Sequence, residues 1–209
     1  MSHGASKGEE FMFDRLKKHI SIGASPEAFD EEFNITFIES GGFTSVESDL
    51  SFFDDIDPED KYVKWFNIKM CVDDDCQQRE IGEIVFCAHY LSDFMEKYNE
   101  PALWLIDDTS SDQEFCSRIL SKRYGIDFDR FQAVAYLDAI LINDQYKDLG
   151  IEEEIVRCFD KIFWMFVRRE LDLVFGISSG DNEHIPRCAN IVDSYEVNNK
   201  IWAKVFTDI

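Results

Sequence analysis

The sequence predicts an α/β (α+β) domain, in which a central, mixed but mostly antiparallel twisted sheet is flanked by helices. Residues 62–72 and 79–90 alternate apolar and polar side chains with the period of a half-buried strand. Residues 131–142 are almost continuously apolar, which is typical of a strand buried on both faces. From residue 150 the apolar period becomes that of a helix. Together these patterns predict helices packed on a sheet.

Composition limits the class of protein. The chain has 209 residues, which suits one domain, and 45% of them are hydrophobic, with 19 Phe among them. Such a chain can bury roughly 70% of its unfolded surface, so a disordered class is excluded. No apolar run approaches the roughly 20 residues of a membrane span, so we expect no membrane insertion. Six cysteines without a CxxC pair, and no secretory signal, favour reduced thiols and a cytoplasmic location.

The charge balance bears on partners. The net charge is -22, from 43 acidic and 21 basic residues. Such a negative field disfavours direct binding of nucleic acid or anionic lipid. A basic protein partner is compatible with it, and so is a surface that is acidic only for solubility.

The first third of the chain contains few clear elements. Residues 1–10 are predicted to be a disordered tail before a single domain over 11–209, and 11–22 show helical spacing. Residues 33–39 alternate like a short strand. The acidic stretch 45–60 also carries Leu, Phe and Ile, so it can be a solvated loop with apolar anchors or a segment that docks on a basic, apolar partner.

In the middle of the chain, the two alternating segments predict an antiparallel hairpin joined by residues 73–77. A short helix over 91–99 is expected to end before Pro101, and 103–106 is a further candidate strand. Ser111 and Glu114 form a capping-box pattern.

That pattern, with Gly125 as a left-handed cap, predicts a helix over 112–124. After the apolar strand we expect a long helix over 150–171 and a strand over 173–178. A helix around 184–192 and a strand over 200–206 complete the predicted order.

The segment from Ala135 to Ile151 resembles the acyl-CoA motif of the GNAT superfamily of acyl-CoA-dependent N-acyltransferases. In that family a strand leads into the pattern Gln/Arg-x-x-Gly-x-Gly/Ala at the head of a helix, and Gln145 and Gly150 fit this register. The order of predicted elements is similar too. The resemblance implies that acetyl-CoA or another acyl-CoA is bound, with its pyrophosphate on main-chain N–H groups. The cofactor-binding residues that it implies are Ile140, Ile142, Gln145, Lys147, Leu149, Gly150 and Ile151.

Charges in the motif depart from the family pattern. Asp148 stands where the first glycine is expected, and Glu152, followed by two more glutamates, stands where a small residue is common. A carboxylate roughly 6 Å from a pyrophosphate opposes binding by up to about 3 kcal/mol at an effective dielectric near 20. Acidic residues in a first helical turn also stabilise the helix, so these glutamates have a structural explanation as well.

The resemblance also implies catalytic residues. The usual glutamate of the motif strand falls near Val134, and Asp138 lies four residues later on the same strand face, as a candidate general base. Tyr195 is the candidate acid for the leaving thiolate. The family implies a sheet that opens beside residues 140–143 as a slot for the pantetheine arm.

Two other features remain open. The segment at about 91–125 is an insertion that the family does not require, and it could form a lid or a partner surface. Cys87 and His89 share one strand face, which suits core packing or, with two more ligands, a metal. We predict no metal site.

Two functions are compatible with these patterns. The first is a divergent GNAT-like N-acyltransferase that passes an acyl group from acyl-CoA to a small-molecule or protein amine substrate. The alternative is an acidic interaction protein that binds a basic partner, either a catalytically inactive GNAT-like protein or one of another kind. A nucleic-acid mimic or an inhibitor would act in this way.

Overall fold

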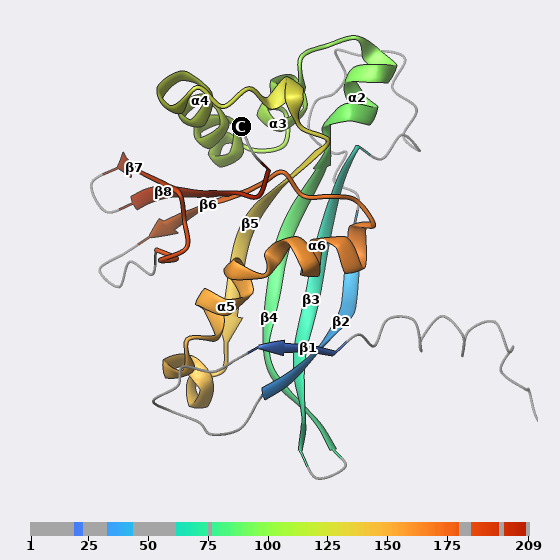
Figure 1. Cartoon of the computed structure of the whole chain (residues 1–209), viewed down its shortest axis with the longest axis vertical. Helices are drawn as coiled ribbons and strands as arrows, with labels where there is room; N and C mark the ends of the chain where they lie inside the picture. Colours follow the sequence, from blue (N-terminus) through green and yellow to red (C-terminus); the bar gives the residue numbers. More distant parts are fainter. Residues whose placement is uncertain are drawn as a thin grey trace, which may run out of the picture.

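The computed structural model describes residues 19–22, 33–43, 62–74, 77–179, 185–196 and 199–207. These residues form one eight-stranded sheet in the order β1-β2-β3-β4-β5-β6-β8-β7 (Figure 1). The strands are β1 (His19–Ile22), β2 (Phe33–Phe43), β3 (Val63–Asp74), β4 (Gln77–Tyr90), β5 (Ala133–Ile142), β6 (Leu173–Ser179), β7 (Ile191–Glu196) and β8 (Asn199–Val205). The α-helices are α2 (Leu91–Tyr98), α3 (Ala102–Asp107), α4 (Ser111–Tyr124), α5 (Ile151–Arg157) and α6 (Phe159–Val167), and η2 (Phe128–Arg130) and η3 (Asp144–Leu149) are 3-10 helices.

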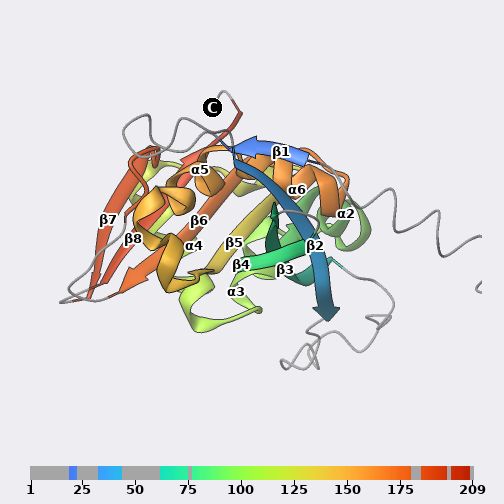
Figure 2. The ribbon, with the colours of Figure 1, turned by 90° about the horizontal axis from the view of Figure 1, so that it is seen from below.

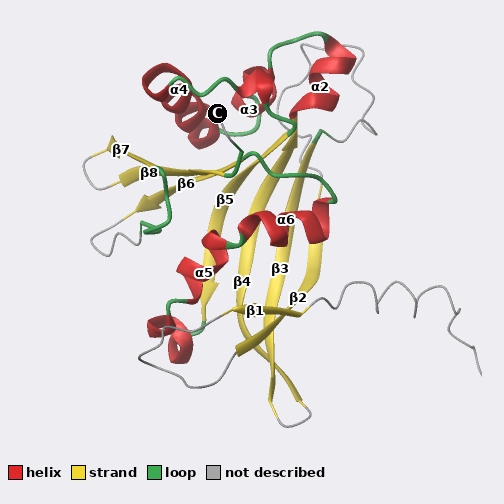
Figure 3. Ribbon diagram, viewed as in Figure 1, coloured by secondary structure: helices red, strands yellow, loops and turns green. Residues whose placement is uncertain are grey.

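The sheet is mostly antiparallel, as the sequence predicts. β5 and β6 form its parallel pair, and the other neighbouring strands in the described chain pair antiparallel. The predicted hairpin is confirmed, since β3 and β4 pair from Val63 opposite His89 to Asp74 opposite Gln77. β2 confirms the predicted strand at 33–39 and continues past a β-bulge to Phe43. Strand and helix layers are distinguished in Figure 3.

Helices cover both faces of the sheet. On one face α5 and α6 pack on β3, β4 and β5, and the ring of Phe86 contacts Phe159 edge-on with 5.2 Å between ring centroids. On the other face α2, α3 and α4 enclose a second core around Phe128 and Phe175. Figure 2 shows α5 and α6 on one side of the strands and α3 on the other. The segment predicted as an insertion at about 91–125 thus supplies the cover of one sheet face.

The cap of α4 lies one residue before the predicted one. The side chain of Ser110, and not of Ser111, accepts the hydrogen bond from the main-chain N–H of Gln113, at 3.3 Å. The predicted C-terminal cap is confirmed, because Gly125 has φ 70°. Only glycine adopts this left-handed conformation without a steric cost from a Cβ atom. α4 is therefore bounded by local signals at both ends.

The strand predicted at 103–106 is wrong, because these residues belong to α3. A run of four apolar residues does not distinguish a short strand from one turn of a buried helix. The tertiary fold decides in favour of the helix. The carboxylate of Asp129, in η2, accepts a hydrogen bond at 2.8 Å from the N–H of Ala102, which begins the helix.

The single long helix predicted over 150–171 is also wrong. It consists of α5 and α6, separated at Cys158 with φ -105° and ψ 21°, and it ends at Arg168 with φ 62°. Lys204, on β8, donates hydrogen bonds from Nζ to the main-chain oxygens of Val156 (3.3 Å) and Arg157 (2.6 Å). A side chain from a distant strand thus satisfies carbonyls at the break. The apolar face continues through it, so periodicity does not reveal it.

The sequence patterns predict helices where the structure has the two edge strands, and these predictions are wrong. β1 occupies the last four residues of the helix predicted at 11–22, and β7 begins within the helix predicted at 184–192. Their main-chain hydrogen bonds come from β2 and β8, so sheet pairing overrides weak helical patterns.

Some predictions lie outside the described residues: the tail at 1–10, the start of the helix at 11–22 and the acidic stretch 45–60. In the described part of the chain, no helix is both long enough and apolar enough to cross a bilayer.

Candidate functional site

The sheet opens between its two parallel strands. β5 and β6 pair over only three residue pairs, from Val134 opposite Leu173 to Tyr136 opposite Phe175. Beyond this point β5 stays paired with β4, and β6 stays paired with β8. Figure 1 shows β6 turning away from β5. We call the resulting cavity, of ≈ 150 Å³, the wedge, and the residues that line it are Leu137, Asp138, Ala139, Ile140, Glu152, Val156, Ile177, Ser178, Pro186 and Trp202.

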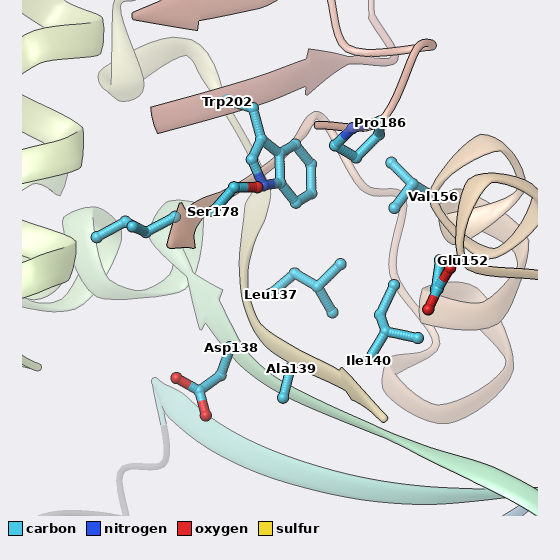
Figure 4. Close-up of a pocket in the computed structure, with 10 residues that line it drawn as sticks. Leu137, Asp138, Ala139, Ile140, Glu152, Val156, Ser178, Pro186 and Trp202 are labelled. Carbon is cyan, nitrogen blue, oxygen red and sulfur yellow. The ribbon is translucent and has the colours of Figure 1, made fainter. Parts of the chain in front are cut away.

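A β-bulge in β5 lies at the mouth of the wedge. Leu137 pairs with Phe86 and Ala139 pairs with Val85, so Asp138 is an extra residue in β5. A bulge of this kind bends a strand and redirects the following side chains, and bulges are frequent beside active sites. Figure 4 shows Asp138 pointing away from Ile140. The strand therefore presents a carboxylate on one face and apolar side chains on the α5 side.

The apex of the wedge is held by Asp172, which is 7% exposed. Its Oδ2 accepts hydrogen bonds from the main-chain N–H groups of Gln132 (2.6 Å) and Ala133 (3.1 Å). Its own N–H donates to the oxygen of Ala133 at 3.0 Å. This buried carboxylate fixes the starts of β5 and β6 together, so the two strands diverge from a rigid point.

The far wall of the wedge depends on a glycine. A Cβ on Gly176 would lie 2.7 Å from the main-chain oxygen of Leu137 and 3.1 Å from the indole of Trp202. Glycine therefore allows the two strands and the indole to approach closely at the point where the strands part. Neither Gly176 nor Trp202 was predicted as a site residue, since no local motif marks them.

The ionisable groups in the wedge are both carboxylates. Burial raises the pKa of Asp138, and the charge of Asp112 at the start of α4 raises it further. Glu152 is the other ionisable residue among those that line the wedge. The site thus combines apolar walls with negative charge, which suits a neutral chain beside a cationic group.

In the predicted anion-binding loop, the positively charged Lys147 forms an ion pair with Asp144. η3 and α5 follow β5, and Gly150 between them has φ 71°. Lys147 Nζ lies 2.6 Å from Asp144 Oδ1, and this hydrogen bond raises the pKa of Lys147. The residue that best suits a phosphate is therefore paired with a carboxylate.

Two glutamates that follow Gly150 have structural roles. Glu153 accepts hydrogen bonds from the main-chain N–H groups of Arg187 (2.7 Å) and Cys188 (2.9 Å). Glu154 pairs with Arg157 at 2.8 Å. These contacts give Glu153 and Glu154 structural roles. Glu152, in contrast, lines the wedge (Figure 4).

The structure brings only some of the predicted site residues together. Asp138 and Ile140 line the wedge. The other implied cofactor residues follow along the chain: Ile142 and Ile151 are buried, Leu149 and Gly150 are half-buried, and Gln145 and Lys147 are exposed. Their predicted roles stay predictions.

The remaining predicted positions lie away from the wedge. Tyr195 is in β7, and β8 and β6 lie between that strand and β5. Val134, where the family's glutamate is expected, is fully buried in the core under α2, α3 and α4. Cys87 and His89 lie in the same core, and the described residues contain no cluster of three or more metal-ligating side chains.

Comparison with known proteins adds little to this geometry. No known family model and no curated protein matches the chain. Arylalkylamine N-acetyltransferase 2 from Aedes aegypti is a similar solved structure, with 13% identity over 70% of this chain and 74% of that one, and a TM-score of 0.34. Mosquito arylalkylamine N-acetyltransferase like 5b has 9% identity over 71% and 76% of the two chains, and a TM-score of 0.32. Likeness at this level carries no argument about function, which depends on the wedge itself.

Proposed function

We propose that the protein is an N-acyltransferase that binds acyl-CoA with its pantetheine arm in the wedge and passes the acyl group to an amine. The observation that carries this proposal is the early separation of β5 from β6 beside the bulge at Asp138. An unbroken ladder between these strands would leave no room for the arm.

The wedge suits an extended chain that contains amides. From Leu137 onward, β5 has no pairing partner on its β6 side among the described residues. Strand edges of this kind present N–H and C=O groups that an added chain can bind, and a pantetheine arm carries two amides. The apolar walls, including Trp202 and Val156, would cover its methylene groups.

The acceptor would be a cationic amine, because carboxylates surround the mouth of the wedge. In the proposed reaction the amine must lose a proton, its nitrogen attacks the thioester carbonyl, the C–S bond breaks and the thiolate takes up a proton. Asp138 would take the amine proton directly or through water, and its raised pKa makes it a stronger base than an ordinary aspartate.

Tyr195 is the residue that the GNAT resemblance implies for protonating the thiolate. Two strands lie between β7, which contains this tyrosine, and β5. The described residues that line the wedge include no tyrosine.

Two observations favour the alternative, an acidic interaction protein that no longer binds CoA. Glu152 lies at the wedge, and Lys147 is paired with Asp144. Both features oppose a pyrophosphate. In this alternative the net charge of -22 would serve a basic protein partner.

Calorimetric titration with acetyl-CoA tests the proposal. The unmodified protein is expected to bind, and Ile140→Trp, which fills the wedge, is expected to lose at least about tenfold in affinity, equivalent to about 1.4 kcal/mol. Leu141→Trp is the matched control, because Leu141 is the next residue of the same strand, is 57% exposed and does not line the wedge. Its affinity should stay near that of the unmodified protein.

The results separate the two functions. Binding that is lost in both tryptophan variants equally would mean that the wedge is not the site. Absence of heat with the unmodified protein at millimolar acetyl-CoA would reject the acyltransferase and favour the interaction protein. Acetyl transfer to a cationic amine, lost in Asp138→Asn with binding retained, would support the assigned base.

A further inference from the structure

Two polar contacts cross the wedge on the face that α5 covers. α5 follows β5 in the chain, whereas β8 is a neighbour of β6 in the sheet, so α5 and β8 belong to the two sides that separate. The three β5 and β6 residue pairs lie at the apex of the wedge, and Asp172 fixes the same end. The opening beyond the apex therefore depends on contacts between α5 and the β8 side.

The first contact is made by Glu153, in the first turn of α5. Its carboxylate accepts hydrogen bonds from the main-chain N–H of Arg187 (to Oε2, 2.7 Å) and of Cys188 (to Oε1, 2.9 Å). These two residues belong to the turn before β7. Asn190 attaches that turn to β8, because its Oδ1 accepts a hydrogen bond from the N–H of Val205 at 2.9 Å. Both oxygens of Glu153 thus join α5 to the β8 side.

The turn that Glu153 holds also supplies a wall of the wedge. Pro186 is buried and lines the wedge, and its main-chain oxygen accepts a hydrogen bond from the N–H of Ala189 at 3.0 Å. Figure 4 shows Pro186 between Val156 of α5 and Trp202 of β8. The proline directly precedes the first N–H group that Glu153 binds, so a movement of this turn would move the wall.

The second contact is made by Lys204 of β8. Its Nζ donates hydrogen bonds to the main-chain oxygens of Val156 (3.3 Å) and Arg157 (2.6 Å). These carbonyls are in the last turn of α5, where a positive charge is favourable. Val156 lines the wedge, and so does Trp202, two residues before Lys204 on the same strand. Lys204 therefore connects two walls of the wedge.

We propose that Glu153 and Lys204 are positioning residues that set the width of the wedge. Glu153 holds the start of α5 and Lys204 holds its end, so together they fix the helix relative to β8. Burial and the charge of Glu153 raise the pKa of the Cys188 thiol, and Lys204 acts in the opposite direction, so both charged groups lie near the same turn. The consequence for ligand affinity rests on the proposed acyltransferase function, whereas the consequence for the width does not.

NMR of the Trp202 indole tests the width without any ligand. Trp202 is 4% exposed, so its ¹H–¹⁵N indole signal reports on the packing of this wall, and Trp202→Phe identifies the signal. Glu153→Ala should shift it. Glu154→Ala is the matched control, because Glu154 is the next residue of α5, pairs within the helix with Arg157 at 2.8 Å and does not line the wedge. An unchanged signal in Glu153→Ala, or equal shifts in both alanine variants, would overturn the proposal.

Calorimetry with acetyl-CoA tests the consequence for binding. A ligand that must itself order the wedge binds less tightly, so Glu153→Ala and Lys204→Met should each lose at least about fivefold in affinity. Glu154→Ala should bind like the unmodified protein. Lys204→Arg should retain most of the affinity, because a guanidinium can donate to the same two carbonyls. If Glu153→Ala does not fold, Glu153→Gln keeps one accepting oxygen and should show a smaller loss and a smaller indole shift.

A merely structural role would give a different result. If the two side chains only stabilise the fold, Glu153→Ala and Lys204→Met should unfold at lower temperature, yet bind acetyl-CoA with unchanged affinity well below their unfolding midpoints. That result would overturn the proposal. If the unmodified protein binds no acetyl-CoA, the acyltransferase fails, but an indole shift in Glu153→Ala that is absent from Glu154→Ala still supports the role of Glu153 in the width.

Discussion

Single residues in this protein acquire their chemistry from burial. His89 lies on β4 and Asp138 on the neighbouring strand β5, and burial disfavours the charged form of each side chain. Burial therefore lowers the pKa of His89 and raises the pKa of Asp138. Asp138 lines the wedge, where the proposed reaction would use it as a base. His89 is enclosed, so its effect is on stability.

His89 gives the protein a specific acid sensitivity. Its folded pKa of about 3 lies below the ordinary value of 6.5, so the unfolded state binds the proton more readily. The stability that it contributes is complete above pH 6.5 and is lost as pH falls towards 3, by up to about 1.4 kcal/mol per pH unit. Between pH 7 and pH 5 the loss should be about 2 kcal/mol.

Urea unfolding at these two pH values provides the measurement. His89→Phe removes the titrating group, so its loss between pH 7 and pH 5 should be smaller than that of the unmodified protein by about the same amount. The other three histidines are common to both proteins and cancel in the difference. Equal losses would show that His89 is protonated in the folded state.

Among the elements, β5 is the one on which the candidate site depends. Its first half is buried between the antiparallel strand β4 and the parallel strand β6. Its second half is no longer paired with β6, bends at a bulge and forms a wall of the wedge. The change occurs within three residues, Leu137, Asp138 and Ala139. A strand that is anchored firmly at one end can diverge at the other without fraying.

Asp172 provides that anchor, and its loss should weaken the fold. Asp172→Ala leaves the N–H groups of Gln132 and Ala133 without their acceptor, at an expected cost of about 2 kcal/mol in the free energy of unfolding. Asp172→Asn keeps a side-chain oxygen that can accept, so it should cost less. Urea denaturation compares the two, and equal losses would mean that the charge, and not the acceptor, is what β5 requires.

At the scale of the whole molecule, charge is the dominant feature. A net charge of -22 on 209 residues repels itself in the compact state. Raising NaCl from about 0.01 M to about 0.1 M shortens the Debye length from about 30 Å to about 10 Å. The thermal unfolding midpoint should therefore rise over this range.

The same screening predicts an unusual dependence of ligand binding on salt. Proteins that bind phosphate groups through basic residues lose affinity as salt increases. Here the wedge is lined by two carboxylates and no cation, so acetyl-CoA affinity should increase with NaCl. Calorimetry at both salt concentrations measures the sign, and a decrease would indicate a basic subsite outside the described residues.

The helices and strands that could be predicted from the sequence are those with strong local signals. Strong period-two patterns identified β3 and β4, and a glycine after a helical pattern identified the end of α4. Weak or short patterns failed: residues 103–106 form a helix, and β1 and β7 exist because other strands pair with them. At the break at Cys158, the free carbonyls accept hydrogen bonds from Lys204, which is far away in the chain.

By itself, the sequence determined the α/β class and the mostly antiparallel sheet, because periodicity and residue type are local properties. Its resemblance to the GNAT motif indicated Asp138 and Ile140 as residues of interest. Only the tertiary structure decided that β5 and β6 part after three pairs, that a bulge at Asp138 shifts Ile140 to the α5 face, and that Gly176 and Trp202 complete the wedge. Those features depend on which strands are neighbours and on where their pairing stops. Such contacts join residues distant in the chain, and no local pattern encodes them.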